Sequence, residues 1–226
     1  MIKLYLKEKI ENIRQDFIST YKHPYTERQF YDGILSYEQI LCFKDLLLKV
    51  EINQNHREKL FVALLHMQIS LDIHDQVDLE NYERITDHRS VRNQLRILVG
   101  DYHSSYFYSL LSQYNMLDEL YHFIEMIKHI NESKMTILHN QEQLTVESLL
   151  KEVENVHCGL YNALSSLYRI SDYQTVWKPK IVHQLVYNRG ESKWLDVLKN
   201  NNSIMIDNEI SKREKFWSPS DIIGDN

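Results

Sequence analysis

The hydrophobic positions of this chain recur at helical spacing and are separated by short polar breaks. At the N-terminus the apolar positions follow one another at steps of three and four, which is typical of one face of an amphipathic helix: Ile2, Leu6, Ile10, Ile13, Phe17 and Tyr21. The same pattern predicts helices over residues 36–50, 55–79, 90–113, 115–138, 145–169, 180–188 and 192–200. Thr145 is the expected N-cap of its helix, because its hydroxyl can accept a bond from a backbone N–H of the first turn. The polar residues 80–88 predict a loop.

Composition supports an all-α protein. The 226 residues are 43% hydrophobic, which is enough for one large core, and they include only 5 glycines and 3 prolines. A protein built on strands would need more turn residues than this. We therefore predict a single all-α domain over residues 1–200, followed by a polar C-terminal tail over residues 201–226.

Charge and cysteine content narrow the class of function. A net charge of −6 argues against nucleic-acid binding, which requires a basic face. The N-terminus alternates charged and apolar residues, and no apolar run reaches the roughly 20 residues of a membrane span. With only Cys42 and Cys158, there is no disulfide framework, so we expect a soluble protein of the reducing cytoplasm. Composition leaves room for peripheral contact with a membrane surface.

The most informative segment begins at His74. It reads His74-Asp75-Gln76-Val77-Asp78-Leu79, then Arg84-Ile85-Thr86, then Gly100-Asp101-Tyr102. This order resembles the first aspartate-rich region of the trans-prenyl diphosphate synthases, which reads H-D-D-x-x-D, then R-R-G, then G-D-Y. On that pattern Asp75 and Arg84 are retained, whereas Gln76 and Leu79 replace the second and third aspartates. Ile85 and Thr86 replace the second arginine and the glycine.

These substitutions remove the chemistry that the motif would perform. Magnesium takes oxygen ligands in near-octahedral geometry, and Leu79 has no oxygen while Gln76 offers only a neutral carbonyl. Ile85 replaces an arginine that would donate charge-assisted hydrogen bonds to phosphate. Asp75 and Asp78 at i and i+3 remain near one another, which leaves a weak metal site open. We favour solvated residues of a helix over that site, and a working ionisation site is not expected. We assign no metal to this chain.

Later parts of the chain extend the resemblance. The catalytic family has a Gly-Glu segment followed by a diphosphate-binding Lys-Thr pair, and here Asn131-Glu132 and Val156-His157 occupy these places. The second aspartate-rich motif is missing, since no Asp-Asp occurs after residue 160. The chain is thus similar to heptaprenyl diphosphate synthase component I, the small non-catalytic subunit of a heterodimeric enzyme, over roughly residues 55–170.

The resemblance implies a fold, a partner and a role. The fold would be an isoprenoid-synthase-like helical bundle, shortened and degenerate relative to catalytic members. The partner would be a catalytic subunit with both aspartate-rich motifs, which would hold Mg²⁺ and most of the prenyl diphosphate product. That subunit would condense isopentenyl diphosphate onto farnesyl diphosphate to make the side chain of menaquinone. The present chain would need no cofactor of its own, and would support activity and influence product length.

The helix over residues 90–113 is apolar on more than one side. Two interpretations stay open: these side chains belong to the core of the chain itself, or they form a subunit interface, where aromatic residues are enriched. The candidates for the interface or for setting chain length are Leu95, Leu98, Val99, Tyr102, Tyr106, Phe107 and Leu110.

Two other classes of function stay open. His74-Asp75 could be the centre of an HD-type metal-dependent phosphohydrolase, with His56 or His66 upstream and Asp101 or Asp118 downstream. Alternatively, the chain could be a helical adaptor without any link to isoprenoids. Metal content would distinguish the phosphohydrolase, and a requirement for a prenyl synthase partner would distinguish the subunit from the adaptor.

Overall fold

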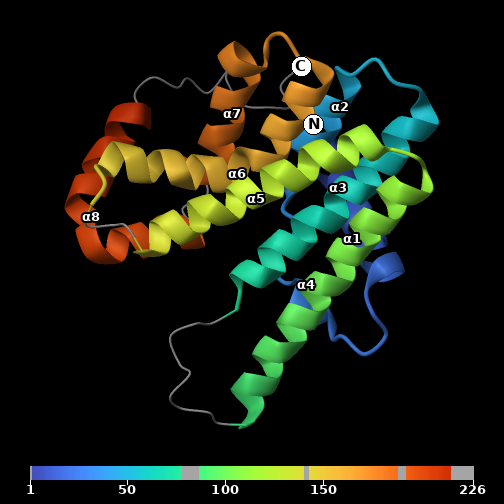
Figure 1. Ribbon diagram of the computed structural model, residues 1–226, viewed down its shortest axis with the longest axis horizontal. Coiled ribbons are helices and arrows are strands. Elements are labelled where there is room, and N and C mark those ends of the chain that lie inside the picture. The colour runs from blue at the N-terminus through green and yellow to red at the C-terminus, as the bar shows by residue number, and fades with distance from the viewer. Residues whose placement is uncertain (1, 78–86, 140–142, 188–191, 215–226) are drawn as a thin grey trace. The chain divides into compact units, whose positions relative to one another are not determined.

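The protein is built from helices throughout the part that the structure describes. This computed structural model describes residues 2–77, 87–139, 143–187 and 192–214, and no strand occurs among them (Figure 1). The all-α prediction is therefore confirmed. The longer helices are α1 (Ile2–Tyr21), α2 (Tyr37–Leu48), α3 (Gln54–Asp75), α4 (Asp87–Gln113), α5 (Leu117–His139), α6 (Val146–Tyr168) and α8 (Lys193–Glu214). The shorter elements are the 3-10 turn η1 (Arg28–Tyr31), and η2 (Tyr173–Trp177), α7 (Lys178–Val182) and η3 (His183–Tyr187), which follow one another directly.

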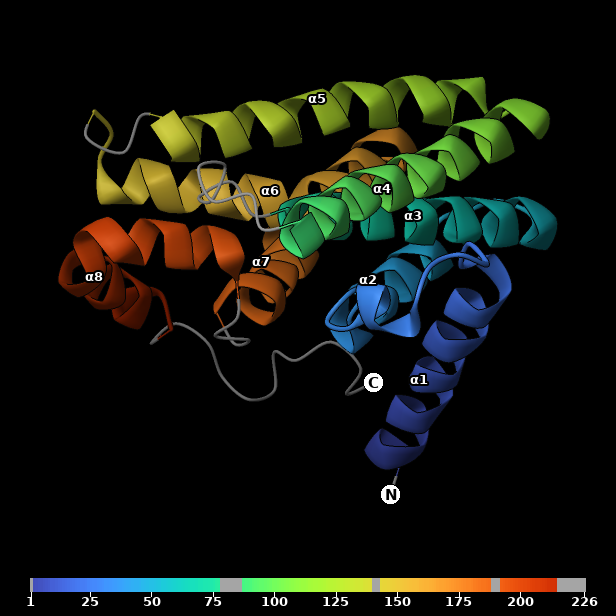
Figure 2. The ribbon, with the colours of Figure 1, turned by 90° about the horizontal axis from the view of Figure 1, so that it is seen from below.

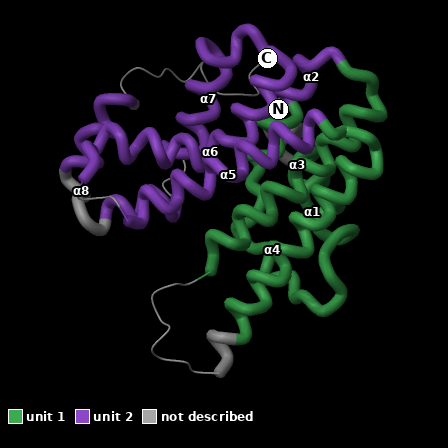
Figure 3. The backbone as a smooth tube through the Cα atoms, in the orientation of Figure 1, with its two compact units in different colours: residues 1–44, 52–117 green, residues 45–51, 118–226 purple. Residues whose placement is uncertain are grey.

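The chain divides into two compact units (Figure 3). Unit 1 comprises residues 1–44 and 52–117, and unit 2 comprises residues 45–51 and 118–226. The prediction of a single domain over residues 1–200 and a separate tail stays a prediction. None of the described helices combines enough length with enough apolar character to cross a membrane.

Unit 1 is organised around α3, which packs lengthwise against α4 (Figures 1 and 2). The two helices run antiparallel, because earlier residues of α3 meet later residues of α4: His74 lies against Gly100, and His66 lies against His103. Between Leu60 and Ile73, α3 buries residues on almost every side. A helix that is apolar around most of its circumference is covered by several neighbours, so α3 forms the centre of this unit.

In unit 2, α5 and α6 meet at Gly159. A methyl group built on Gly159 would lie 2.4 Å from Cγ1 of Ile130, so only glycine allows the two helices this close approach. Thr145 accepts a bond from the backbone N–H of Ser148, which confirms the predicted N-cap of α6.

A polar cluster holds the C-terminal helix of unit 2, α8, against α6 and η3. The Tyr187 hydroxyl donates to the Glu154 carboxylate at 2.6 Å, and the Arg213 guanidinium donates to the Tyr187 hydroxyl at 3.0 Å and pairs with Glu154. The guanidinium and the hydroxyl both stabilise the carboxylate of α6, so this cluster fixes the end of α8 against α6 and η3.

Among the long helices, the C-terminal ends of α3 and α8 differ most from those that the sequence predicts. The structure ends α3 at Asp75 with Gln76 as its C-cap, so the prediction that this helix continues to Leu79 is wrong. The last helix does not stop near Asn200 but continues to Glu214. The physical reason is burial, because Ile206 and Ile210 are buried at a spacing of four and extend the apolar face across an asparagine-rich segment of low helix propensity.

Candidate functional site

The degenerate motif lies at the C-terminal end of α3, in unit 1. Its described residues are His74 to Val77, whereas Asp78, Leu79, Arg84, Ile85 and Thr86 lie outside the residues whose side chains the structure describes. Because α3 ends at Asp75, the helical i,i+3 and i,i+4 spacing from Asp75 to Asp78 and Leu79 is not that of a described helix. The expected proximity of Asp75 and Asp78 therefore stays a prediction, because Asp78 lies outside the described residues.

Gln76 has a structural task that an aspartate could not perform. Its side-chain amide donates to the backbone carbonyl of Asp32 at 3.2 Å, and its own backbone carbonyl accepts a bond from the Arg96 guanidinium at 2.8 Å. A carboxylate in place of the amide would have no proton to give and would face a carbonyl oxygen. The residue that replaces the second aspartate thus joins α3 to the loop before α2.

The structure brings His74 and Gly100 together, although they lie 26 positions apart in the sequence. A Cβ on Gly100 would be 2.5 Å from Nε2 of His74, so the absence of a side chain is what lets the ring rest on α4. The same Nε2 lies 3.4 Å from an oxygen of the Asp101 carboxylate. The first and last segments of the motif are therefore neighbours in space, and their contact belongs to helix packing.

The most deeply embedded carboxylate near the motif is Asp72, which sequence reasoning missed. It accepts bonds from the backbone N–H of Leu35 at 3.1 Å and from the side-chain amides of Gln39 and Gln68 at 3.2 and 2.8 Å. Burial raises the pKa of this carboxyl to about 6, against the lowering effect of the bond from Leu35. Leu35 has a positive φ of 53°, a conformation that side chains disfavour, and Asp72 helps to hold it there.

A second buried feature is the pair formed by His66 and His103, here called the imidazole pair. Their Nδ1 atoms are 2.9 Å apart, and Nε2 of His103 lies 3.0 Å from the Tyr31 hydroxyl. Both histidines are fully buried. Burial lowers the pKa of His66 to about 3, with a further contribution from His103, and lowers that of His103 to about 4. Both rings are therefore neutral at pH 7, and one of them donates a hydrogen bond to the other through the two Nδ1 atoms.

Aromatic side chains surround the imidazole pair. Tyr106 stacks on the His66 ring at 4.7 Å and 8°, and Phe17 and Tyr21 meet the same ring edge-on. Nε2 of His66 is buried without a hydrogen-bond partner among the described residues. The geometry therefore favours a buried residue that is hydrogen-bonded to His103 over the metal ligand that a phosphohydrolase would need at His66. The sequence offered no signal that would join residues 66 and 103.

The interface and chain-length candidates on α4 fall into different environments. Val99 and Phe107 are buried within the chain, Leu98 is 63% exposed, and Tyr102 and Tyr106 are partly buried near the imidazole pair. Leu95 and Leu110 are also partly buried. The hydroxyl of Tyr102 donates to that of Tyr106 at 3.4 Å.

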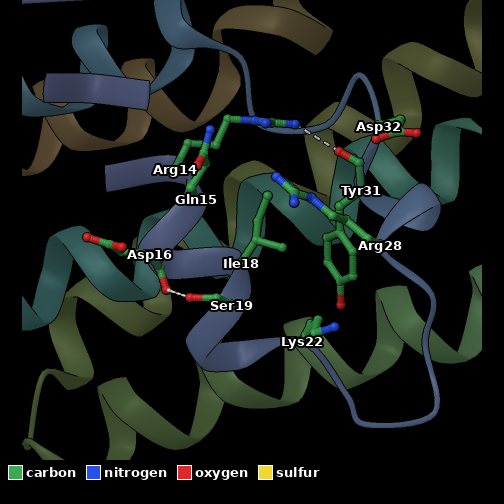
Figure 4. A pocket seen from close by; sticks show the side chains of 9 residues that line it. All are labelled: Arg14, Gln15, Asp16, Ile18, Ser19, Lys22, Arg28, Tyr31 and Asp32. Carbon is green, nitrogen blue, oxygen red and sulfur yellow. Dashed lines mark hydrogen bonds between the residues drawn. The ribbon is translucent and has the colours of Figure 1, made fainter. Parts of the chain in front are cut away.

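A pocket of about 330 Å³ lies between the end of α1 and η1 (Figure 4). One wall is Arg14, whose guanidinium donates to the backbone carbonyls of Tyr31, Ile34 and Leu35 at 2.9 to 3.1 Å. Lys22 and Arg28 line it together with the carboxylates of Asp16 and Asp32. The charges are mixed, and Arg14 is committed to the loop, so this pocket has no strong preference for an anion.

The described residues of the motif do not fit a magnesium–diphosphate site. They supply the Asp75 carboxylate, while Gln76 is neutral and engaged with Asp32. Within the described parts of the chain, no group of three or more His, Cys, Asp or Glu side chains is placed to hold a metal. The HD-type phosphohydrolase therefore gains no support from these residues, and His66 in particular points to His103.

Comparison with known proteins supplies the family. The family model described as heptaprenyl diphosphate synthase subunit 1 matches residues 23–218, most of the chain. The chain belongs to this family. Among curated proteins, it is 32% identical over 103 residues to heptaprenyl diphosphate synthase component 1 of Geobacillus stearothermophilus. That match covers 46% of this chain and 44% of the relative, so it spans less than half of either protein. No solved structure matches the chain.

Membership of the subunit 1 family confirms the resemblance drawn from the motif. The match begins near η1 and ends beyond α8, so it includes parts of both units.

Proposed function

We propose that this chain is the non-catalytic subunit of a heterodimeric long-chain trans-prenyl diphosphate synthase. Its partner is a catalytic chain with two aspartate-rich motifs and bound Mg²⁺, which condenses isopentenyl diphosphate onto farnesyl diphosphate in the cytoplasm. The product is the precursor of the menaquinone side chain, and most of it is bound by the partner. The observation that carries the proposal is Gln76, whose amide joins α3 to the Asp32 carbonyl where catalysis would need a carboxylate on magnesium.

Exposed apolar side chains on α4 and on α5 support the proposal that this chain forms a stable complex with a partner. On α4, Val91, Leu98 and Tyr108 are exposed, and α5 carries further exposed apolar side chains. Apolar surface that a chain leaves uncovered commonly marks a site of protein association. Obligate interfaces bury on the order of 2,000 Å² or more of largely apolar area.

The first test of the proposal is association. Co-expression with a catalytic chain that bears both aspartate-rich motifs is expected to yield a 1:1 complex, because the exposed apolar side chains would then be buried. Co-purification followed by sedimentation velocity measures this stoichiometry. A soluble monomer that does not bind such a catalytic chain would instead favour the hypothesis of a helical adaptor.

A second prediction concerns product length. Each carbon of a growing chain adds about 0.8 kcal/mol of favourable burial, so termination requires a wall of bulky side chains. We expect Leu98→Ala and Tyr102→Ala in the complex to lengthen the product or broaden its distribution, as measured by chromatography of the dephosphorylated products. Tyr25→Ala is the matched control, because that tyrosine is 88% exposed in the loop after α1. An unchanged profile for both α4 variants, with the complex intact, would exclude α4 from setting chain length.

A further inference from the structure

Helix α5 has two apolar faces, and its own unit covers only one of them. The inner face is buried through Phe123, Ile130 and Ile137, with α6 packed beneath it in unit 2 (Figure 2). A second set of apolar side chains on the same helix is between 40% and 66% exposed: Leu117, Tyr121, Ile124, Met135 and Leu138.

The exposed set forms one straight stripe along the helix. Its positions advance by alternate steps of four and three through residues 117, 121, 124, 128, 131, 135 and 138, which is the repeat of a helix–helix seam. Only two members of this series are polar, namely Lys128 and Asn131, and both are exposed. Lys128 holds the central position of the seven. No hydrogen bond or ion pair within the described residues engages its ammonium group.

A charge at the centre of an apolar seam determines which partner can bind there. If two copies of this chain paired along the whole stripe, antiparallel about a twofold axis, the two Lys128 side chains would meet at that axis. A parallel pairing in register would also oppose them. Like charges brought together in a desolvated seam are unfavourable, and a single charged residue at such a position is a common way to specify the partner. The stripe therefore disfavours a second copy of the chain.

We propose that the α5 stripe docks a helix of a different chain, with apolar side chains flanking a central carboxylate that pairs with Lys128. The apolar positions supply buried area, and Lys128 selects the hetero-complex over self-association. This inference rests on the proposed function, because it takes the catalytic chain as the source of that helix.

The first arm of the test reverses the charge in the complex. Lys128→Glu is expected to weaken binding of the catalytic chain at least tenfold, as measured by titration calorimetry, because two carboxylates would then face each other. Lys151→Glu is the matched control, since Lys151 is an exposed lysine on the outer surface of α6, and it should leave the affinity unchanged. Unchanged affinity in Lys128→Glu, or an equal loss in the control, would overturn the proposal.

The second arm needs no partner and separates this inference from the proposed function. Lys128→Leu completes the apolar seam, so the isolated variant is expected to dimerise at lower concentration than the natural chain in sedimentation equilibrium, while Lys151→Leu should not. A Lys128→Leu variant that self-associates no more than the natural chain would overturn the role of Lys128. Failure of the natural chain to bind any catalytic chain would instead count against the proposed function.

Discussion

Lowering the pH from 7 to 5 is expected to destabilise this protein through the imidazole pair. In the unfolded chain His66 and His103 titrate near pH 6.5, whereas in the folded chain their pKa values fall to about 3 and 4. Between these limits the unfolded state binds more protons, so the free energy of unfolding falls as the pH falls. The loss at pH 5 is about 2 kcal/mol for each histidine. Urea denaturation at the two pH values measures it.

Other titrating groups near the pair do not cancel this effect. The rings that face the pair are Phe17, Tyr21, Tyr31, Tyr102 and Tyr106. None of these rings carries a carboxyl or an imidazole group. The partly buried His23 contacts Tyr102 at the edge of the cluster.

Asp72 acts in the opposite direction. In the folded chain the pKa of the Asp72 carboxyl is raised to about 6. As the pH falls from about 6 towards 4, the folded state therefore binds this proton before the unfolded state does, and the free energy of unfolding rises. Two histidines outweigh one carboxyl, and the net change is a loss of stability.

Paired variants isolate the contribution of the histidines. Replacing both rings in His66→Phe/His103→Phe should flatten the dependence of unfolding free energy on pH, whatever its effect on stability at pH 7. His122→Ala is the matched control, because His122 is exposed on α5 and bonds only to a backbone carbonyl of its own helix in the described contacts. If the double variant does not fold, NMR titration of the natural imidazoles gives the same answer. Histidine pKa values near 6.5 in the folded chain would contradict the account.

The substitution Asp72→Ala is expected to cost about 3 kcal/mol of unfolding free energy at pH 7. It would leave the Leu35 N–H and the amides of Gln39 and Gln68 without their common acceptor. An unsatisfied buried donor costs about 1–3 kcal/mol, and the loop at Leu35 would also lose a contact that holds its positive φ. Thermal or urea unfolding measures the loss.

A matched variant separates this network from a general effect of removing charge from α3. Glu58 lies on the same helix, and its carboxylate accepts a bond from Gln54 on the exposed surface. Glu58→Ala is expected to change the free energy of unfolding by less than about 0.5 kcal/mol. Equal losses in the two variants would show that Asp72 has no special structural task.

Local patterns predicted the helices well where each helix has one clear apolar face. The stripe from Ile2 to Tyr21 corresponds to α1, and Thr145 caps α6 as expected. The wrong predictions lie at positions where tertiary contacts, rather than the local sequence pattern, determine where a helix ends. Gln76 ends α3, and burial of Ile206 and Ile210 carries α8 through residues of weak helix propensity.

The candidate site was only partly accessible to sequence reasoning. The order of the motif indicated the family, because His74-Asp75, Arg84 and Gly100-Asp101-Tyr102 follow one another as in the trans-prenyl diphosphate synthases. Its physical basis, the contact of the His74 ring with Gly100, depends on how α3 packs on α4. The link between His66 and His103 and the bond that the Leu35 N–H donates to Asp72 join residues 37 positions apart in each case. No periodicity along one helix could indicate them.

The activity of the isolated chain tests the central claim most directly. The purified chain is incubated with farnesyl diphosphate, labelled isopentenyl diphosphate and Mg²⁺, alone and together with a catalytic chain. The account predicts no prenyl product from the chain alone, even in a Gln76→Asp/Leu79→Asp variant, since the second aspartate-rich motif is absent from the sequence. It also predicts long-chain product from the mixture, in excess of what the catalytic chain makes by itself. Prenyl product from the isolated natural chain, or a mixture no more active than the catalytic chain alone, would contradict the account.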